Sequence, residues 1–250
     1  MKNFFTLALI CFAVIALPAQ NFMKLSQNIL TAQRDGKDAS AFVEQLATTS
    51  PDDLKAEINT QEEKLAFWIN VYNGLIQYYL SKNPELFDDR GDFFSDDLLT
   101  IAGEKVSFDN LEHGVLRRNT SKFSGGYFSN PFADDWYEQY QVEKIDWRIH
   151  FALNCGASSC PPIRVYDSKS VYDQLNASSR MYLNSQVKYK KEEEEVYVPA
   201  LMSWFRGDFG GLDGVRNILV KNDYIPNNED IDIEFNEYDW TLKLGTFYKD

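Results

Sequence analysis

The sequence predicts a single α+β domain over residues 20–250, with a helical N-terminal lobe packed on a mainly antiparallel sheet. In the first third of the chain, apolar residues recur at the three- and four-residue steps of helices. Later segments are short, alternate between apolar and polar residues, and are separated by Gly, Pro and charged turns, as antiparallel strands are. The chain shows no internal repeat and no linker rich in Pro, Gly or Ser, which favours one domain over several.

Helices are expected through most of the first 80 residues. Residues 22–46 place apolar side chains at helical intervals. Ser50 before Pro51 predicts the start of a second helical segment, because serine caps helices and proline suits their first turn. The clearest helix runs from Glu62 to Leu80. Its apolar side chains at three- and four-residue steps are Leu65, Trp68, Ile69, Tyr72, Leu75, Ile76 and Tyr79.

Shorter elements are expected in the middle of the chain. Residues 98–108 alternate weakly around a glycine, which predicts a hairpin. Asp109 is expected to cap a short helix that carries Glu112 and His113. Residues 147–153 place apolar side chains at every second position, which predicts a strand.

The C-terminal third is expected to alternate between helices and strands. A run of glutamates after several lysines is typical of a solvated turn between two strands. The predicted elements are a helix from Ser168 or Ser170 to about Asn184, strands over 187–189 and 196–198, a short helix after Pro199, a helix over 215–222 and strands within 231–244.

Residues 1–19 have the pattern of a secretory signal peptide. Lys2 precedes the apolar run 4–17, and Ala19 is a small residue at a suitable cleavage point. The run is short for a membrane span, although an uncleaved anchor is the alternative. We therefore expect an exported protein, periplasmic or extracellular, with no stable membrane insertion after cleavage.

The net charge of the chain argues against some classes of binding partner. A net charge of −13 and a pI near 4.6 argue against nucleic acid or an anionic membrane surface. No motif indicates a cofactor or a metal ion as a resident group, and no EF-hand spacing is present. We expect the partner to be a small-molecule or peptide substrate.

Both histidines of the chain, and two of its three cysteines, fall within one short stretch. They are His113, His150, Cys155 and Cys160. Thiol and imidazole are the side chains best suited to nucleophilic and proton-transfer chemistry near neutral pH. Their clustering predicts a Cys/His-centred site.

The first hypothesis is nucleophilic catalysis by Cys155. A neighbouring imidazole converts the thiol to the reactive thiolate, and a third group orients the imidazole. We prefer His113 as the base, with Glu112 beside it, and keep His150 in the site. Gly156 allows backbone N–H groups to approach an oxyanion. Such a papain-like site would serve a hydrolase or acyl transferase acting on amide, ester or thioester bonds.

Several other residues are expected to support this site. Cys160 is the weaker nucleophile, because the two prolines that follow it offer no backbone donors. Asn70, Asn73 and Asn154 are expected to orient the base or to tether loops, since buried amides need partners. Arg148 has the guanidinium that would clamp a substrate carboxylate, although in so acidic a chain it is also expected to pair with Asp or Glu.

Two alternatives do not require a thiolate. Cys155 and Cys160 enclose a short loop, and an exported protein meets an oxidising compartment, so the two form a disulfide in the second hypothesis. The chain is then a non-enzymatic binding protein whose disulfide shapes a ligand loop. In the third hypothesis both histidines and both cysteines bind tetrahedral zinc, although their spacing matches no familiar ligand pattern.

Several separated segments resemble the family called domain of unknown function 547. Together they span residues 62–242, and the block over 148–161 is the longest and most specific of them. The resemblance implies a common fold and a common site, and it implies no particular reaction. The segments are 67–73 (FWINVYN), 111–117 (LEHGVLR), 148–161 (RIHFALNCGASSCP), 198–205 (VPALMSWF) with Asp208-Phe209, and 238–240 (YDW).

Overall fold

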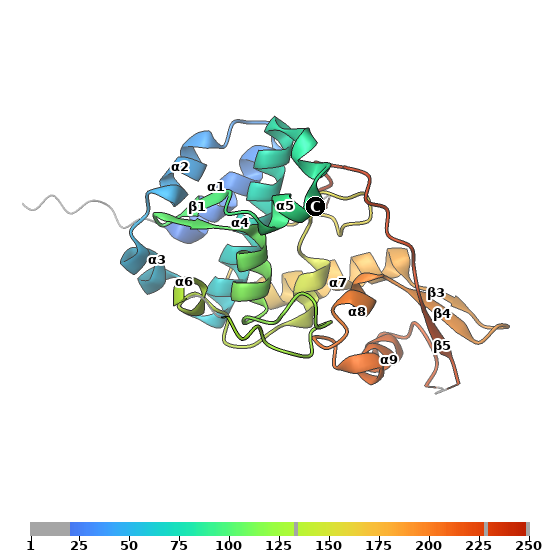
Figure 1. Cartoon of the computed structure of the whole chain (residues 1–250). Helices are drawn as coiled ribbons and strands as arrows, with labels where there is room; N and C mark the ends of the chain where they lie inside the picture. The colour runs from blue at the N-terminus through green and yellow to red at the C-terminus, as the bar shows by residue number, and fades with distance from the viewer. Residues whose placement is uncertain (1–20, 133–134, 228–229, 249–250) are drawn as a thin grey trace, which may run out of the picture.

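The computed structural model describes residues 21–132, 135–227 and 230–248. The predicted signal peptide, residues 1–19, lies outside these ranges. The N-terminal part is a group of helices followed by a hairpin (Figure 1). Its elements are α1 (Phe22–Arg34), α2 (Ser40–Ala47), α3 (Pro51–Glu57), α4 (Gln61–Lys82), η1 (Pro84–Phe87), α5 (Arg90–Ser95), β1 (Leu99–Ile101), β2 (Glu104–Val106) and η2 (Asn110–Leu116).

The C-terminal part mixes short helices with a small sheet. Its elements are α6 (Asp135–Glu138), η3 (Trp147–Phe151), α7 (Val171–Gln186), β3 (Lys188–Lys190), β4 (Glu195–Val198), α8 (Leu201–Trp204), α9 (Gly211–Lys221) and β5 (Asp232–Phe235). β3 pairs antiparallel with β4, and β5 adds to β4 in parallel. With the antiparallel β1–β2 hairpin, two of the three pairings among the described strands are antiparallel, so the predicted α+β class is confirmed.

The predicted central helix is present as α4, and it organises the larger core. Thr60 and Glu63 form a reciprocal capping box at its start. Most of its side chains are buried on every face, because α1, η1, η2 and α7 all pack against it. A second core lies around β4, α9 and Phe151, and Tyr238 packs against both cores.

The strand predicted over 147–153 is wrong, because this segment is the 3₁₀ helix η3. Asp146 begins it by accepting a hydrogen bond from the backbone N–H of Arg148 at 3.0 Å. Ile149, His150 and Phe151 are consecutive and all buried. The apolar alternation in the sequence therefore does not correspond to alternating burial.

Asp109 does not make the predicted helix cap. Its side chain accepts no capping hydrogen bond, and its carboxylate pairs with Lys122 instead. The start of η2 is held by Ser107 and Asn110, whose side chains each accept a hydrogen bond from the other's backbone N–H, at 2.8 and 3.1 Å.

The tail beyond β5 returns to the helical lobe in an extended path (Figure 1). The backbone N–H of Ser158 donates to the carbonyl of Thr241 at 2.8 Å. The backbone N–H of Lys243 donates to the carbonyl of Gly156 at 2.7 Å. The N–H of Gly245 donates to the side chain of Gln77 on α4 at 2.8 Å. The tail therefore joins the loop that contains both cysteines to the central helix.

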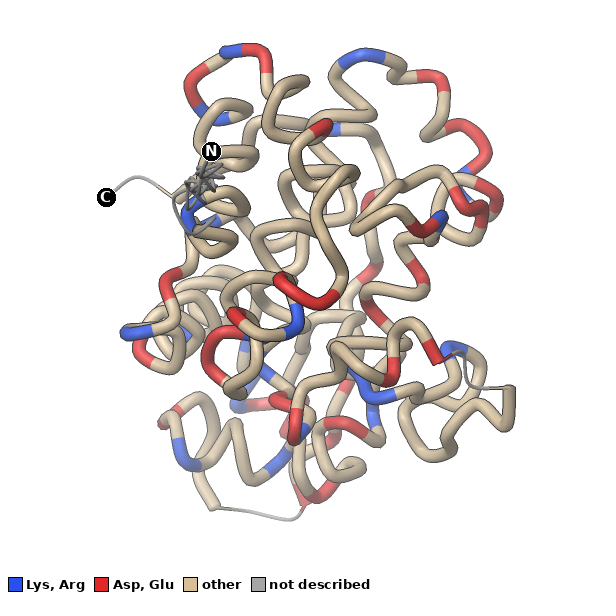
Figure 2. Tube along the Cα trace, turned by 90° about the vertical axis from the view of Figure 1, so that its left-hand side faces the viewer, with Lys and Arg blue, Asp and Glu red and all other residues tan. Residues whose placement is uncertain are grey.

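The surface carries charges of both signs. In the view of Figure 2, Lys and Arg are interspersed with the more numerous Asp and Glu. None of the helices over the described ranges has the length and apolarity needed to cross a membrane.

Candidate functional site

A cavity of about 430 Å³ lies where η2, α8, the cysteine loop and the C-terminal tail meet. Its walls are largely aromatic, and a few polar side chains enter it from η2 and η3. Both histidines, both cysteines of the loop and Glu112 line it. The structure therefore brings these five predicted residues to one place. The aromatic lining residues are Tyr72, Phe94, Trp204, Phe205, Tyr238 and Trp240.

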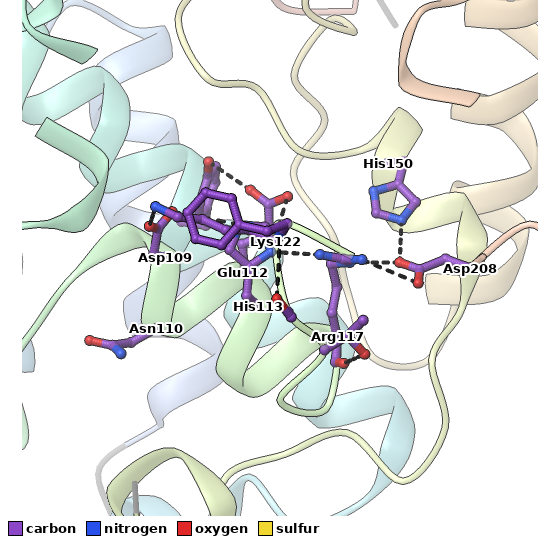
Figure 3. A network of polar contacts seen from close by, with 12 residues as sticks. Asp109, Asn110, Glu112, His113, Arg117, Lys122, His150 and Asp208 are labelled. Atoms are coloured by element: carbon purple, nitrogen blue, oxygen red, sulfur yellow. Dashed lines mark hydrogen bonds and ion pairs between the residues drawn. The ribbon is translucent and has the colours of Figure 1, made fainter. Parts of the chain in front are cut away.

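Two polar side chains of the cavity, those of Glu112 and His113, come from η2, which is a π-helix. The N–H groups of Arg117 and Asn119 donate to the carbonyls five residues earlier, those of Glu112 and Gly114, at 2.8 and 2.9 Å. π-helical turns are rare and are frequent at functional sites. This turn places Glu112, His113 and Arg117 in one network (Figure 3).

Arg117 and Asp208 form a buried ion pair at the centre of that network. Nε of Arg117 donates to Asp208 Oδ2 at 2.6 Å, and Nη2 donates to Oδ1 at 3.3 Å. Each side chain is only 1% exposed. Burial alone would raise the pKa of Asp208, but hydrogen bonds from His150 and Arg117 outweigh it and lower this pKa, so the carboxylate stays ionised.

His150 is held by the same carboxylate. Its Nε2 lies 2.8 Å from Asp208 Oδ2, and its ring stacks on Phe205 with the ring centroids 3.9 Å apart. Burial lowers the pKa of His150, so the ring is neutral and carries its proton on Nε2. Nδ1 is buried and has no hydrogen-bond partner within the described part of the chain. His150 therefore has an oriented ring with an unengaged lone pair.

The lone pair of His113 is already engaged. Nδ1 lies 2.7 Å from Nη1 of Arg117, which can only donate. The proton of the neutral ring is therefore on Nε2, which lies 3.6 Å from Asp109 Oδ1. Burial, and then the charge of Arg117, hold the pKa of His113 well below its usual range. This geometry favours His150 over His113 as a proton acceptor.

Glu112 does not orient His113, because its Oε1 lies 4.0 Å from Nδ1. Its Oε2 accepts a hydrogen bond from the hydroxyl of Tyr72 at 3.2 Å. Burial raises the pKa of Glu112 to about 7, against the opposing effect of Arg117. The carboxyl is therefore partly protonated near neutral pH, which is typical of functional sites.

The two sulfurs of the cysteine loop are bonded to each other. Cys155 and Cys160 form a disulfide, and the hydroxyl of Tyr238 lies 3.4 and 3.1 Å from their sulfurs. Neither sulfur makes a hydrogen bond to an imidazole in the ranges described. The N–H of Cys155 points at the Cys160 sulfur at 3.1 Å, and that of Gly156 donates to Asn154 Oδ1 at 3.0 Å. The predicted oxyanion donors thus have partners already.

Where the structure can be described, it contains no group of three His, Cys, Asp or Glu side chains that could hold a metal ion. With both sulfurs in the disulfide, the four-ligand zinc hypothesis has no support in this geometry.

The three predicted asparagines tether loops around the cavity. The amide of Asn70 makes two hydrogen bonds to the backbone of Tyr166, at 2.8 and 2.9 Å. That of Asn73 bonds the backbone of Ala152 and Asn154 at 2.9 and 2.8 Å. Asn154 in turn closes the cysteine loop by donating to the Pro161 carbonyl at 2.8 Å.

Arg148 does not line the cavity. Its guanidinium pairs with Asp146 through Nε at 2.8 Å and donates from Nη1 to Asn176 at 2.7 Å. It therefore holds η3 against α7. The expected pairing of Arg148 with an acidic side chain is present, as its bond to Asp146 shows.

Gly156→Ala should destabilise the fold by about 1–3 kcal/mol. Gly156 has a φ of +92°, and an added Cβ would lie 2.8 Å from Leu80 Cδ1. The measurement is the free energy of unfolding in urea. The control is Gly103→Ala, at a positive φ with open space around it, which should cost less. An equal cost for both variants would show that contact with Leu80 contributes nothing.

Fold and site together define an α+β protein with a buried Arg–Asp–His network beside an aromatic cavity. The chain belongs to the family of proteins of unknown function DUF547, whose model matches residues 56–183. No curated protein and no solved structure matches it. The matched span includes Glu112, both histidines and both loop cysteines, whereas the walls supplied by α8 and the tail follow it.

Sequence reasoning did not include Asp208, Tyr238 or Trp240 among the site residues, and for Asp208 it left open a bond to an arginine or to a loop amide. Asp208 holds both Arg117 and His150, and the two aromatic side chains form a wall of the cavity. All three stand in segments that resemble the family, and this resemblance was the available signal.

Proposed function

We propose that this chain is an exported protein that binds a small ligand in the aromatic cavity. One observation carries the proposal: the two sulfurs that line the cavity are bonded to each other and are contacted by Tyr238, so they form part of its wall. A disulfide suits the oxidising compartment that the predicted signal peptide implies. The volume and apolar lining suit a small organic molecule.

A second candidate is a Cys/His-dependent hydrolase or acyl transferase that acts once the disulfide is reduced. It is favoured by the unengaged lone pair of His150, oriented by Asp208 in the same cavity. A dithiol reductant would open the disulfide to two thiols. The Cys155 thiol would pass its proton to His150 Nδ1, and the thiolate would attack the acyl carbon, so that the alcohol, amine or thiol leaves with the proton from His150. Water or a second nucleophile would then take the acyl group from the sulfur and regenerate the thiol.

Thiol alkylation separates the two candidates. The native chain, without reductant, is treated with iodoacetamide, and modified peptides are identified by mass spectrometry. We expect no modification of Cys155 or Cys160 until a reductant is added, and then modification of both. After reduction, alkylation of Cys155 that is much faster than that of Cys160 would instead support the enzyme, because an activated thiolate reacts faster than an ordinary thiol. Peptide mapping keeps Cys11, in the predicted signal peptide, separate from this result.

A further inference from the structure

We propose, on the basis of the ligand-binding function above, that the ligand is an organic cation. Its ammonium group would lie between the Glu112 carboxylate and the aromatic side chains of the cavity. A quaternary ammonium or an alkylated amine has this chemistry.

Glu112 has no cationic partner in the part of the chain that the structure describes. Asp109 is paired with Lys122, and Asp208, behind His150, is paired with Arg117. Across the described ranges, no Lys or Arg nitrogen lies within ion-pair distance of Glu112, whose side chain is 15% exposed. It is therefore a carboxyl that lines the cavity and, among the described residues, accepts a side-chain hydrogen bond only from the Tyr72 hydroxyl.

The other charged groups around Glu112 are paired or neutral. The Asp109–Lys122 and Arg117–Asp208 pairs each cancel, and both imidazoles are held neutral by burial. Arg90 also lines the cavity, but its guanidinium lies over the rings of Phe87 and Trp240 and, within the described ranges, makes no ion pair with Glu112. An ionised Glu112 is thus a negative charge without an adjacent counter-charge. A cationic group placed beside Glu112 neutralises that charge, whereas an anionic group there would add to it.

Aromatic side chains form the wall of the cavity that an ammonium group would contact. Trp204, Tyr238 and Trp240 form one cluster, with ring centroids 4.6 to 5.6 Å apart. Trp204 and Trp240 line the cavity and are still 38% and 37% exposed, so part of their surface is available to a ligand beside Arg90, whose guanidinium lies 5.3 Å from the centroid of the Trp240 ring. The electron-rich faces of aromatic rings attract cations, and quaternary ammonium groups are bound in this way in other proteins.

Binding should also release a proton. Glu112, with its pKa raised to about 7, is mostly protonated at pH 6 in the free cavity. A cation beside it favours the ionised form, so its proton leaves as the ligand enters. Tyr72, Asp109, His113, Arg117 and Lys122 face Glu112, and Arg90 lines the same cavity. Burial raises the pKa of Tyr72 well above its usual value and holds that of His113 well below its usual range, so neither group titrates between pH 6 and 8.

The test uses choline and its neutral isostere 3,3-dimethylbutan-1-ol, titrated by calorimetry into the full chain. We expect choline to bind at least about tenfold more tightly at pH 8. At pH 6, titrations in two buffers of different ionisation enthalpy should show close to one proton released per choline bound, and much less at pH 8. Affinity for choline should rise between pH 6 and 8.

Two variants complete the test. Glu112→Gln should weaken choline binding about tenfold or more, abolish proton release and leave the isostere unaffected. Glu192→Gln removes the same charge from the exposed β3–β4 turn and should change neither. Equal binding of both probes would overturn the proposal that the ligand is a cation, but the proposal that the cavity binds a ligand would stand. If neither probe binds, the proposal that the ligand is a cation is also overturned. Ligand binding itself is then decided by whether a panel of neutral aromatic fragments quenches the tryptophan fluorescence of the chain.

Discussion

Replacing Asp208 by asparagine is expected to lower the free energy of unfolding by about 3–5 kcal/mol. Arg117 and Asp208 are almost fully buried, and the change leaves the guanidinium without a counter-charge. His150 also loses the carboxylate that accepts from its Nε2. The measurement is urea unfolding at pH 7, followed by circular dichroism.

A surface pair provides the matched control for this prediction. Asp35 pairs with Arg34 at 3.0 Å, but both side chains are well exposed to water. Asp35→Asn should leave the urea midpoint close to that of the unchanged chain, because water screens such pairs. If Asp208→Asn unfolds at the same midpoint as well, then the buried network does not stabilise the fold.

Glu112→Gln is expected to stabilise the protein by about 3 kcal/mol at pH 8 and to have little effect at pH 4. The folded-state pKa of Glu112 is raised to about 7 from an ordinary value of 4.5. The unfolded chain therefore loses this proton first, and the folded state loses stability as the pH rises from about 4.5 to about 7. Glutamine cannot ionise, and its amide oxygen still accepts from Tyr72.

The difference between the two unfolding curves isolates Glu112 from the histidines. Burial lowers the pKa of both His113 and His150, so their effect is opposite: folded-state stability is lost as the pH falls below about 6.5. That effect is present in both chains and cancels in the difference. Glu192→Gln, on an exposed turn, should follow the unchanged chain at every pH. A Glu112→Gln difference that does not change with pH would contradict the raised pKa.

Sequence patterns were sufficient to predict the helices and strands whose formation depends on residues close together in the chain. The helix expected over 62–80 is α4, because its apolar periodicity and the Thr60 cap act within a few residues. The 98–108 hairpin and the strands flanking the acidic turn were found for the same reason. The segment 147–153 was missed because its side chains are buried by distant elements, which a periodicity within the segment does not show.

The candidate site was predictable to the extent that its residues are unusual in the chain. The scarcity of histidine and cysteine brought His113, His150 and the cysteine loop to attention, and all of them line one cavity. Their hydrogen-bond partners were not predictable. Asp208 lies 91 positions beyond Arg117, and the chain has many carboxylates from which a sequence pattern cannot choose.

The return of the C-terminal tail to α4 bears on when the cavity forms during protein synthesis. Gln77 receives its hydrogen bond from Gly245, 168 positions later, and Trp240 reaches the cavity on the same tail. Contacts between positions so far apart form late, and the C-terminal partner leaves the ribosome last. The polar groups of the network, which extend to Asp208, therefore precede the tail that closes the cavity around them. A ligand is enclosed only once that tail has docked on α4.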